Sequence, residues 1–221
     1  MEDVVIPAPT WNDEIAYGRM RANGVVPIVT ISNRSQAAPL CEALAAGGIT
    51  TVEITLRSDA AFDAIEEVAG RAELSVGVGT VVNSAQVDEA FARGADFIVS
   101  PGFSPSVVAR SIELGLWAVP GVATASEVQL AVSLGVQRLK LFPAEVLGGV
   151  ALLSALEGPF AGVEFMPSGG INLTNLREYL CFPTVFAVGC SWIASPKMLA
   201  ESDFDSIATA ARIAISTAAR N

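Results

Sequence analysis

The chain has 221 residues, of which 52% are hydrophobic and 16% are charged, and its formal net charge is −10. This composition predicts one compact globular domain with a sizeable core and excludes an intrinsically disordered chain. Because non-specific binding to nucleic acid or to anionic lipid depends on clustered lysine and arginine, the acidic balance predicts neither partner.

The cysteines and the first residues indicate the compartment. Cys41, Cys181 and Cys190 are odd in number and lack the spacing of metal ligands, so we expect neither a disulfide framework nor a zinc site. The first residues are acidic where a signal peptide would be basic, and no apolar run is long enough for a membrane span. We therefore expect a cytoplasmic protein without a membrane partner.

In chain order, a helix is expected over residues 11–20, and from residue 25 onward one unit repeats: a short β-branched run, a turn and an alanine-rich segment of helical period. The expected strands cover residues 25–31, 51–55, 74–78, 96–99, 116–119, 138–142, 163–166 and 185–188. The clearest helices between them cover residues 35–46, 59–69, 84–93, 104–114, 124–134 and 173–179.

Eight alternating strand and helix units are typical of a parallel barrel. The fold class predicted here is α/β, a single (β/α)8 TIM barrel with an extra N-terminal helix. Residues 25–221 are expected to form the barrel, and residues 1–24 a helical extension that caps its bottom.

Alternation along two strands predicts polar side chains inside this barrel. In the second strand the apolar Val52 and Ile54 are expected to face the helices, which turns Glu53 inward. In the sixth strand the same alternation turns Lys140 inward, near the C-terminal strand ends where barrel enzymes carry their active sites. Arg138 lies nearer the N-terminal end of that strand and is expected to make structural hydrogen bonds.

The surroundings of Lys140 suggest chemistry. An ammonium group flanked by apolar side chains is costly to desolvate, and the neutral amine that desolvation favours attacks carbonyls to form a Schiff base. Two structural interpretations compete: a lysine stem on apolar surface with its head in water, or a buried ion pair with Glu53. Barrel interiors are mostly apolar, so two charged side chains there are unusual. We therefore favour a catalytic role for Lys140 and Glu53 over a structural one.

Two glycine-bearing loops follow the last two expected strands. The first reads Pro167-Ser168-Gly169-Gly170-Ile171-Asn172 and the second Gly189-Cys190-Ser191, which leads into an expected short helical turn. Glycines let backbone N–H groups approach an anion closely, and barrels often bind phosphate at these two loops. Glycines also make ordinary tight turns, but two such loops in neighbouring positions favour a phosphate site.

Several short motifs occur in order, one at each strand end, and together they resemble the class I aldolases that act on 2-keto-3-deoxy-6-phosphogluconate and 2-keto-4-hydroxyglutarate. The resemblance covers residues 25 to 221. The motifs are Gly48-Ile49-Thr50-Thr51-Val52-Glu53-Ile54-Thr55-Leu56-Arg57, Gly77-Val78-Gly79-Thr80-Val81, Ser100-Pro101-Gly102, Pro120-Gly121-Val122-Ala123-Thr124, Lys140-Leu141-Phe142-Pro143-Ala144-Glu145 and Ser168-Gly169-Gly170-Ile171.

The resemblance implies a lyase that cleaves 2-keto-3-deoxy-6-phosphogluconate to pyruvate and glyceraldehyde 3-phosphate, with no metal or organic cofactor. It implies that Lys140 forms the Schiff base and that Glu53 is the general acid and base. The remaining site residues that it implies are Arg57 and Thr80 for the substrate carboxylate, Pro101 and Phe142 for the pocket wall, and Ser168, Gly169, Gly170, Gly189, Cys190 and Ser191 for the phosphate. It also implies a homotrimer.

The chain departs from the family pattern at two positions of the phosphate loops. Ser168 replaces a frequent threonine and keeps its hydroxyl group, whereas Cys190 replaces a frequent glycine, so its side chain is expected to narrow the loop or restrict its backbone. Residues 30–32 lack the basic side chain that some relatives have there. Three alternatives stay open: the same chemistry on 2-keto-4-hydroxyglutarate, the same chemistry on the galactonate-derived epimer, and a phosphosugar-binding barrel without catalysis.

Overall fold

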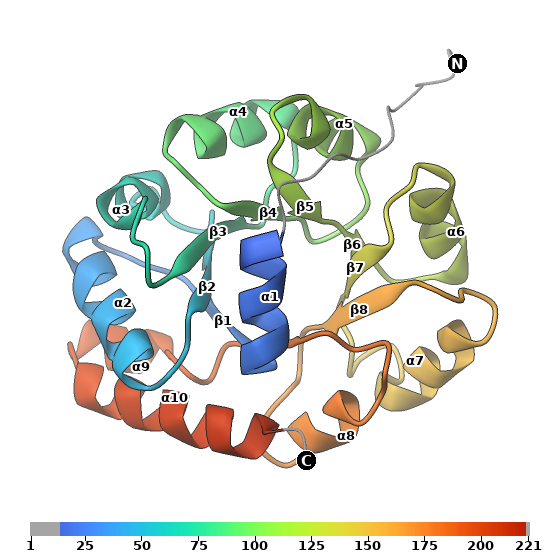
Figure 1. Ribbon diagram of the computed structural model, residues 1–221. Coiled ribbons are helices and arrows are strands. Elements are labelled where there is room, and N and C mark those ends of the chain that lie inside the picture. Colours follow the sequence, from blue (N-terminus) through green and yellow to red (C-terminus); the bar gives the residue numbers. More distant parts are fainter. Residues whose placement is uncertain (1–13, 220–221) are drawn as a thin grey trace.

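The computed structural model describes residues 14–219 (Figure 1). Its strands are β1 (Val25–Val29), β2 (Thr51–Thr55), β3 (Ser75–Gly79), β4 (Phe97–Val99), β5 (Trp117–Val119), β6 (Gly121–Val122), β7 (Arg138–Leu141), β8 (Glu164–Pro167) and β9 (Val188–Cys190). Its helices are α1 (Glu14–Asn23), η1 (Arg34–Gln36), α2 (Ala37–Ala46), α3 (Ala61–Val68), α4 (Ser84–Ala92), α5 (Pro105–Glu113), α6 (Ala125–Ser133), α7 (Gly149–Glu157), α8 (Leu176–Leu180), α9 (Pro196–Ala200) and α10 (Phe204–Ala218).

The strands form a curled, parallel sheet in two pieces. One piece has the order β5-β4-β3-β2-β1-β9 and the other the order β6-β7-β8. Between the pieces, β5 and β6 are separated only by Pro120, and isolated bridges join Phe165 to Val185 and Ser168 to Gly189. Figure 1 shows the strands around a central axis, with helices outside and α1 across one end. The predicted α/β fold with parallel strands is confirmed.

The boundaries of several elements differ from the sequence prediction. The last strand was expected over residues 185–188, but β9 begins at Val188, where pairing with Val25 of β1 starts. Val185 and Phe186 come before β9 and contact β8 instead: Val185 forms an isolated bridge to Phe165, and the Phe186 N–H donates to Phe165 O at 3.1 Å. The strand expected over residues 116–119 is observed as β5, and Pro120 separates it from the additional short strand β6. The ladder is interrupted at Pro120 because proline lacks the N–H that a continuous ladder needs. The expected first helix lies at Glu14–Asn23; residues 11–13 of that prediction lie outside the described residues.

The interior and exterior faces of the strands carry separate hydrophobic clusters. The inner cluster comprises Ala16, Met20, Val26, Phe97, Val99, Trp117, Val119, Met166, Phe186 and Ala187. Ala16 and Met20 belong to α1, so this helix closes the N-terminal end of the strands, and burial of a side chain such as Met20 stabilises that arrangement by about 1.5–3 kcal/mol. Val52, Ile54, Leu139 and Leu141 lie in the outer cluster, against the helices, which confirms the predicted alternation.

Arg138 lies at the closed end, as predicted from its position in the strand. Its Nε donates to Glu164 at 3.3 Å, and its guanidinium carbon lies 3.6 Å from the centroid of the Tyr17 ring. The Tyr17 hydroxyl also donates to Glu164, at 2.9 Å. These contacts link α1 to β7 and β8, so Arg138 has a structural role.

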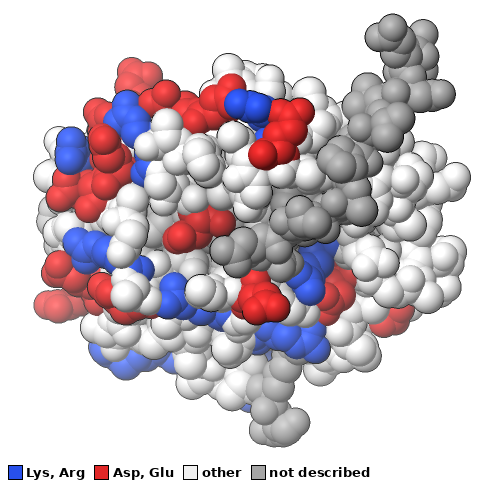
Figure 2. Space-filling view, turned by 45° about the horizontal axis from the view of Figure 1, so that its top comes forward, with Lys and Arg blue, Asp and Glu red and all other residues white. Residues whose placement is uncertain are grey.

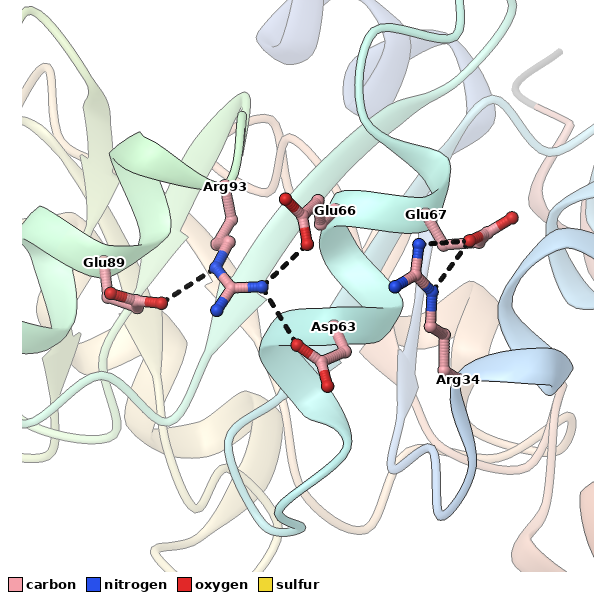
Figure 3. A network of polar contacts seen from close by, with 6 residues as sticks. All are labelled: Arg34, Asp63, Glu66, Glu67, Glu89 and Arg93. Atoms are coloured by element: carbon pink, nitrogen blue, oxygen red, sulfur yellow. Dashed lines mark hydrogen bonds and ion pairs between the residues drawn. The ribbon is translucent and has the colours of Figure 1, made fainter.

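Ion pairs connect neighbouring helices on the outer surface. Arg93 contacts Asp63 at 2.9 Å, Glu66 at 2.7 Å and Glu89 at 2.8 Å, and Arg34 contacts Glu67 (Figure 3). Charged side chains of both signs cover the left side of the view in Figure 2, whereas the right side is largely uncharged. Within residues 14–219, no helix combines the length and apolar character that a membrane span requires.

Candidate active site

Lys140 and Glu53 meet inside the ring of strands. Lys140 Nζ lies 3.1 Å from Oε1 and 3.3 Å from Oε2 of Glu53, although the two residues are far apart in sequence. Lys140 is 6% exposed and Glu53 1%. Both side chains come from interior positions of their strands, β7 and β2, so the proximity predicted from alternation is confirmed. A charge pair held away from water can exchange a proton, and the same contact also fits a purely structural ion pair.

The Glu53 carboxylate occupies space that Gly79 leaves free. A Cβ atom built on Gly79 would lie 2.2 Å from Oε1 and 2.6 Å from Cγ of Glu53. Gly79 is paired with Thr55 in the register of β2 and β3, two residues beyond the pairing of Glu53 with Gly77. The glycine is therefore needed for the carboxylate to turn inward at this level, a role that sequence alone did not separate from a tight turn.

The two residues predicted for the pocket wall, Pro101 and Phe142, lie near Lys140. The Phe142 ring centroid lies 5.5 Å from Lys140 Nζ, close enough for a cation–π contact with the ammonium form. Gly121 is the Cα partner of Lys140, and a Cβ atom on Gly121 would lie 2.3 Å from the Pro101 carbonyl oxygen. The loop that carries Pro101 therefore packs directly on the strand beside the lysine.

Arg57 and Thr80 follow the neighbouring strands β2 and β3. The backbone N–H of Leu56 donates to Gly79 O at 2.9 Å, so the two loops start side by side. Thr80 has a φ of 65°, a left-handed conformation that is rare for a β-branched residue and is found mainly at functional sites. Arg57 is exposed, which leaves its guanidinium accessible to a ligand at the C-terminal ends of the strands.

The two glycine loops lie together, as the sequence predicted. Ser168 and Gly189 form a bridge, and a Cβ atom on Gly189 would lie 2.2 Å from Ser168 Oγ. Gly169 and Gly170 both have positive φ values, 94° and 84°, which glycine adopts without strain. Gly170 and Ser191 are exposed, so their backbones can reach a ligand. A short turn at residues 193–194 follows the second loop, where a short helical turn was expected, and α9 begins only at Pro196.

The Cys190 side chain faces away from these loops. It lies in the outer cluster with Val188, while Gly189 between them faces Ser168 and the interior. Burial raises the pKa of the Cys190 thiol to about 12, so it stays protonated at neutral pH. The expectation that this side chain narrows the phosphate loop is therefore wrong, because alternation in β9 turns it outward; only the Cys190 backbone is available to a ligand.

Two hydroxyl groups lie at the C-terminal ends of β1 and β2, and the sequence analysis did not assign them to the site. Thr55 Oγ1 donates to Val29 O at 3.1 Å and lies 2.8 Å from Thr30 Oγ1. Because the Thr55 proton is committed to Val29, the Thr30 hydroxyl is the donor between the two threonines. Thr30 directly follows β1, in the segment of residues 30–32 that lacks the basic side chain of some relatives. Thr55 lies two residues after Glu53 in β2, so the alternation that turns Glu53 inward was the sequence signal that could have pointed to it.

Known proteins resemble this chain closely. A sequence model of the KDPG and KHG aldolase family matches residues 17–210. The 2-dehydro-3-deoxy-phosphogluconate aldolase of Treponema pallidum is 43% identical over 184 residues, which is 83% of this chain and 88% of that protein.

Two solved structures resemble the fold over most of its length. The KDPG aldolase of Legionella pneumophila, with pyruvate captured as a covalent carbinolamine intermediate, matches with a TM-score of 0.86 and 36% identity over 89% of this chain and 96% of that one. The 2-keto-3-deoxy-6-phosphogluconate aldolase of Zymomonas mobilis with 3-phosphoglycerate matches with a TM-score of 0.85 and 36% identity over 91% of this chain and 95% of that one.

Proposed function

Because the chain belongs to the KDPG and KHG aldolase family, we propose that it cleaves 2-keto-3-deoxy-6-phosphogluconate (KDPG) to pyruvate and glyceraldehyde 3-phosphate, through a Schiff base on Lys140. It is a lyase. The observation that carries the proposal is the buried contact of 3.1 Å between Lys140 Nζ and Glu53 Oε1, because one amine and one proton carrier suffice for class I aldol chemistry.

The reaction starts with proton transfer from Lys140 Nζ to Glu53, which leaves a neutral amine. The amine attacks the C2 carbonyl of the substrate to give a carbinolamine, and protonated Glu53 donates its proton to the hydroxyl group that leaves as water. The resulting iminium withdraws electrons from the neighbouring C3–C4 bond. Glu53, again a carboxylate, is then ready for the cleavage step.

In the cleavage step Glu53 accepts the proton of the C4 hydroxyl group. The C3–C4 bond breaks, its electron pair forms the pyruvyl enamine on Lys140, and glyceraldehyde 3-phosphate leaves. Glu53 returns its proton to C3 of the enamine, and water hydrolyses the iminium to release pyruvate. These steps need neither a metal ion nor an organic cofactor.

The substrate carboxylate is assigned to Arg57 and Thr80 at the adjacent ends of β2 and β3. A guanidinium group can bind a carboxylate with two parallel hydrogen bonds. The positive φ of Thr80 turns the chain after β3 in a direction that an extended residue at this position would not give. Pro101 and Phe142 are assigned to the pocket wall, where they exclude water from the Schiff base.

The phosphate group is assigned to the two glycine loops, residues Ser168, Gly169, Gly170, Gly189, Cys190 and Ser191. Their support is the bridge between Ser168 and Gly189 and the exposed backbone of Gly170 and Ser191. A relative of similar fold holds 3-phosphoglycerate, which has the phosphorylated three-carbon skeleton of the product with a carboxylate in place of the aldehyde.

A second substrate is 2-keto-4-hydroxyglutarate (KHG), which the family name includes. KHG carries a carboxylate in place of the phosphorylated end of KDPG, so the Lys140 chemistry is unchanged and only the outer contacts differ. The galactonate-derived epimer differs at C4, next to the proton that Glu53 accepts. The hydroxyl pair of Thr30 and Thr55 is the candidate for discrimination between such substrates.

The test is pyruvate release from KDPG, its C4 epimer and KHG, measured with lactate dehydrogenase as the coupling enzyme. We expect the highest kcat/KM for KDPG. Turnover of KHG alone would retain the chemistry and contradict the phosphate assignment, whereas turnover of the C4 epimer alone would retain both and change only the preferred configuration at C4. If none of the three substrates is turned over and borohydride fails to trap pyruvate on the protein, a non-catalytic phosphosugar-binding barrel would be favoured.

The proposal also covers the closure of the barrel, the location of the protein and its oligomeric state. The bridges that join β8 to the segment leading into β9, and the short Pro120 interruption, support a closed (β/α)8 barrel over residues 25–221 with residues 1–24 as its extension. A phosphorylated keto acid does not cross membranes unaided, which supports a cytoplasmic location. The exposed apolar side chains of Leu130, Val132 and Val146, together with a largely uncharged side of the surface in Figure 2, support a homotrimer.

A further inference from the structure

A buried tyrosine and a glutamate lie behind the first glycine loop. Tyr179 of α8 is fully buried, and its hydroxyl group donates to Glu145 Oε1. Glu145 follows β7 by a few residues, after Phe142, and so belongs to the loop that carries one wall of the pocket. The pair therefore links α8 to the loop next to Lys140.

The Glu145 side chain supports the backbone of the first glycine loop directly. A Cβ atom on Gly170 would lie 2.6 Å from both Cβ and Cγ of Glu145, so the loop backbone packs on the glutamate stem. The Glu145 N–H donates to Gly169 O at 3.1 Å, and the Ala144 N–H donates to Ser168 O at 2.8 Å. A movement of Glu145 would therefore move the loop at Gly169 and Gly170.

The tyrosine fixes where the glutamate stem lies. Gly149, at the start of α7, has no Cβ, and a Cβ there would lie 3.0 Å from Glu145 Oε1 and 3.1 Å from the Tyr179 hydroxyl oxygen. The hydrogen bond thus occupies a space that the chain keeps open. Burial and the bond to Glu145 both raise the pKa of Tyr179, so its hydroxyl remains a donor at any working pH.

We propose that Tyr179 and Glu145 are positioning residues that hold the loop of Gly169 and Gly170 in the geometry needed to bind the substrate phosphate. This inference rests on the function proposed above, and it assigns a role to side chains that touch neither Lys140 nor the substrate. Without the tyrosine hydroxyl, the Glu145 carboxylate turns to solvent, its stem leaves Gly170, and the loop loses its support.

The test uses Tyr179→Phe, which keeps the buried ring and removes only the hydroxyl group. The sequence offers a matched control, because it contains 2 tyrosines and the other one, Tyr17, also donates to a glutamate, Glu164, at the closed end of the strands. The readouts are the dissociation constant of inorganic phosphate by calorimetry, KM and kcat for KDPG and KHG, and trapping of pyruvate by borohydride.

For Tyr179→Phe we expect the phosphate dissociation constant and KM for KDPG to rise about tenfold, the scale of one lost hydrogen bond to a charged group. We expect KM for KHG, kcat and pyruvate trapping to match the wild type, and Tyr17→Phe to change none of these values. Glu145→Gln, which keeps the stem against Gly170 and weakens the bond, should give a smaller rise and serves if Tyr179→Phe does not fold.

Three results would overturn the inference: phosphate affinity unchanged in both Tyr179→Phe and Glu145→Gln, an equal rise of KM for KDPG and KHG, or a wild-type protein that does not bind phosphate. Failure of the proposed function has a different signature, since pyruvate trapping and turnover would then be absent from the wild type itself. Intact trapping with no phosphate effect would therefore contradict the positioning role alone.

Discussion

Gly79 and Glu53 share one space: a Cβ atom on Gly79 would lie 2.2 Å from the Oε1 atom of Glu53. The glycine thus sets the position of the carboxylate that contacts Lys140. Glu53 is 1% exposed, so its carboxylate has no solvent-filled space into which it could move if a side chain were added at Gly79.

Gly79→Ala should therefore displace the Glu53 carboxylate and lower kcat for aldol cleavage by about 100-fold, a loss that a shift of about 1 Å in an active site can produce. Stopped-flow measurement of pyruvate release checks this. The control is Gly18→Ala in α1, where the added Cβ meets nothing within 4 Å. Gly18→Ala should leave kcat unchanged and stabilise the fold by about 0.5–1 kcal/mol. Equal kcat values for both variants would contradict the role of Gly79.

Lys140 should be the residue that borohydride traps with pyruvate. Lys140→Met should abolish the covalent adduct in mass spectrometry and lower activity by at least about 1,000-fold, because the nucleophile is lost. The sequence contains one other lysine, Lys197, which is exposed on α9. Lys197→Met should retain both adduct and activity. An adduct on Lys197, or one that persists in Lys140→Met, would place the Schiff base elsewhere.

Some parts of this site could be predicted from sequence and others could not, for a physical reason. The inward direction of Glu53 and Lys140 follows from alternation along a strand, which is a local property. The fit of Gly79 to Glu53 and the support of Gly170 by Glu145 join segments distant in the chain, so no local pattern carries them. The start of the last strand differs from the prediction for a related reason: Val185 forms an isolated bridge to Phe165 of β8, whereas continuous pairing with β1 begins only at Val188, and a local hydrophobic pattern does not tell which neighbour each residue meets.

The buried ion pair should make the stability of single variants depend on charge. Lys140→Met leaves the Glu53 carboxylate buried without its cation, which should lower the free energy of unfolding by about 3 kcal/mol. The double variant Lys140→Met with Glu53→Gln removes the uncompensated charge and should recover most of that loss. Urea denaturation at neutral pH measures all three proteins. Additive losses in the double variant would show that the two side chains do not interact.

Arg57 should contribute to affinity for the keto-acid carboxylate through its planar guanidinium. Arg57→Lys keeps the charge and removes the paired geometry, so the concentration of pyruvate needed for half-maximal borohydride trapping should rise about tenfold. Arg212→Lys in α10, an exposed arginine whose contact is with Thr209, is the control and should have no effect. An unchanged pyruvate dependence in Arg57→Lys would remove Arg57 from the site.

The cysteines should differ in reactivity because two of the three are buried. Cys41 and Cys190 are buried and Cys181 is exposed. Desolvation raises the pKa of both buried thiols from 9.0 to about 12, so neither forms a thiolate at neutral pH in the folded protein. Dithionitrobenzoate at pH 8 should titrate one thiol in the native protein and all three in urea, and Cys181→Ser should remove the native reaction.

The same burial gives stability a defined dependence on alkaline pH. A thiol whose folded pKa lies above its unfolded value favours the folded state fully below the unfolded pKa, because both states then bind the proton. As pH rises from 9 toward 12, the unfolded chain releases these protons while the folded chain retains them, so the free energy of unfolding should fall across this window. Cys190→Ala should reduce the slope in urea titrations at successive pH values. A slope identical to that of the wild type would mean that the Cys190 thiol ionises equally in both states.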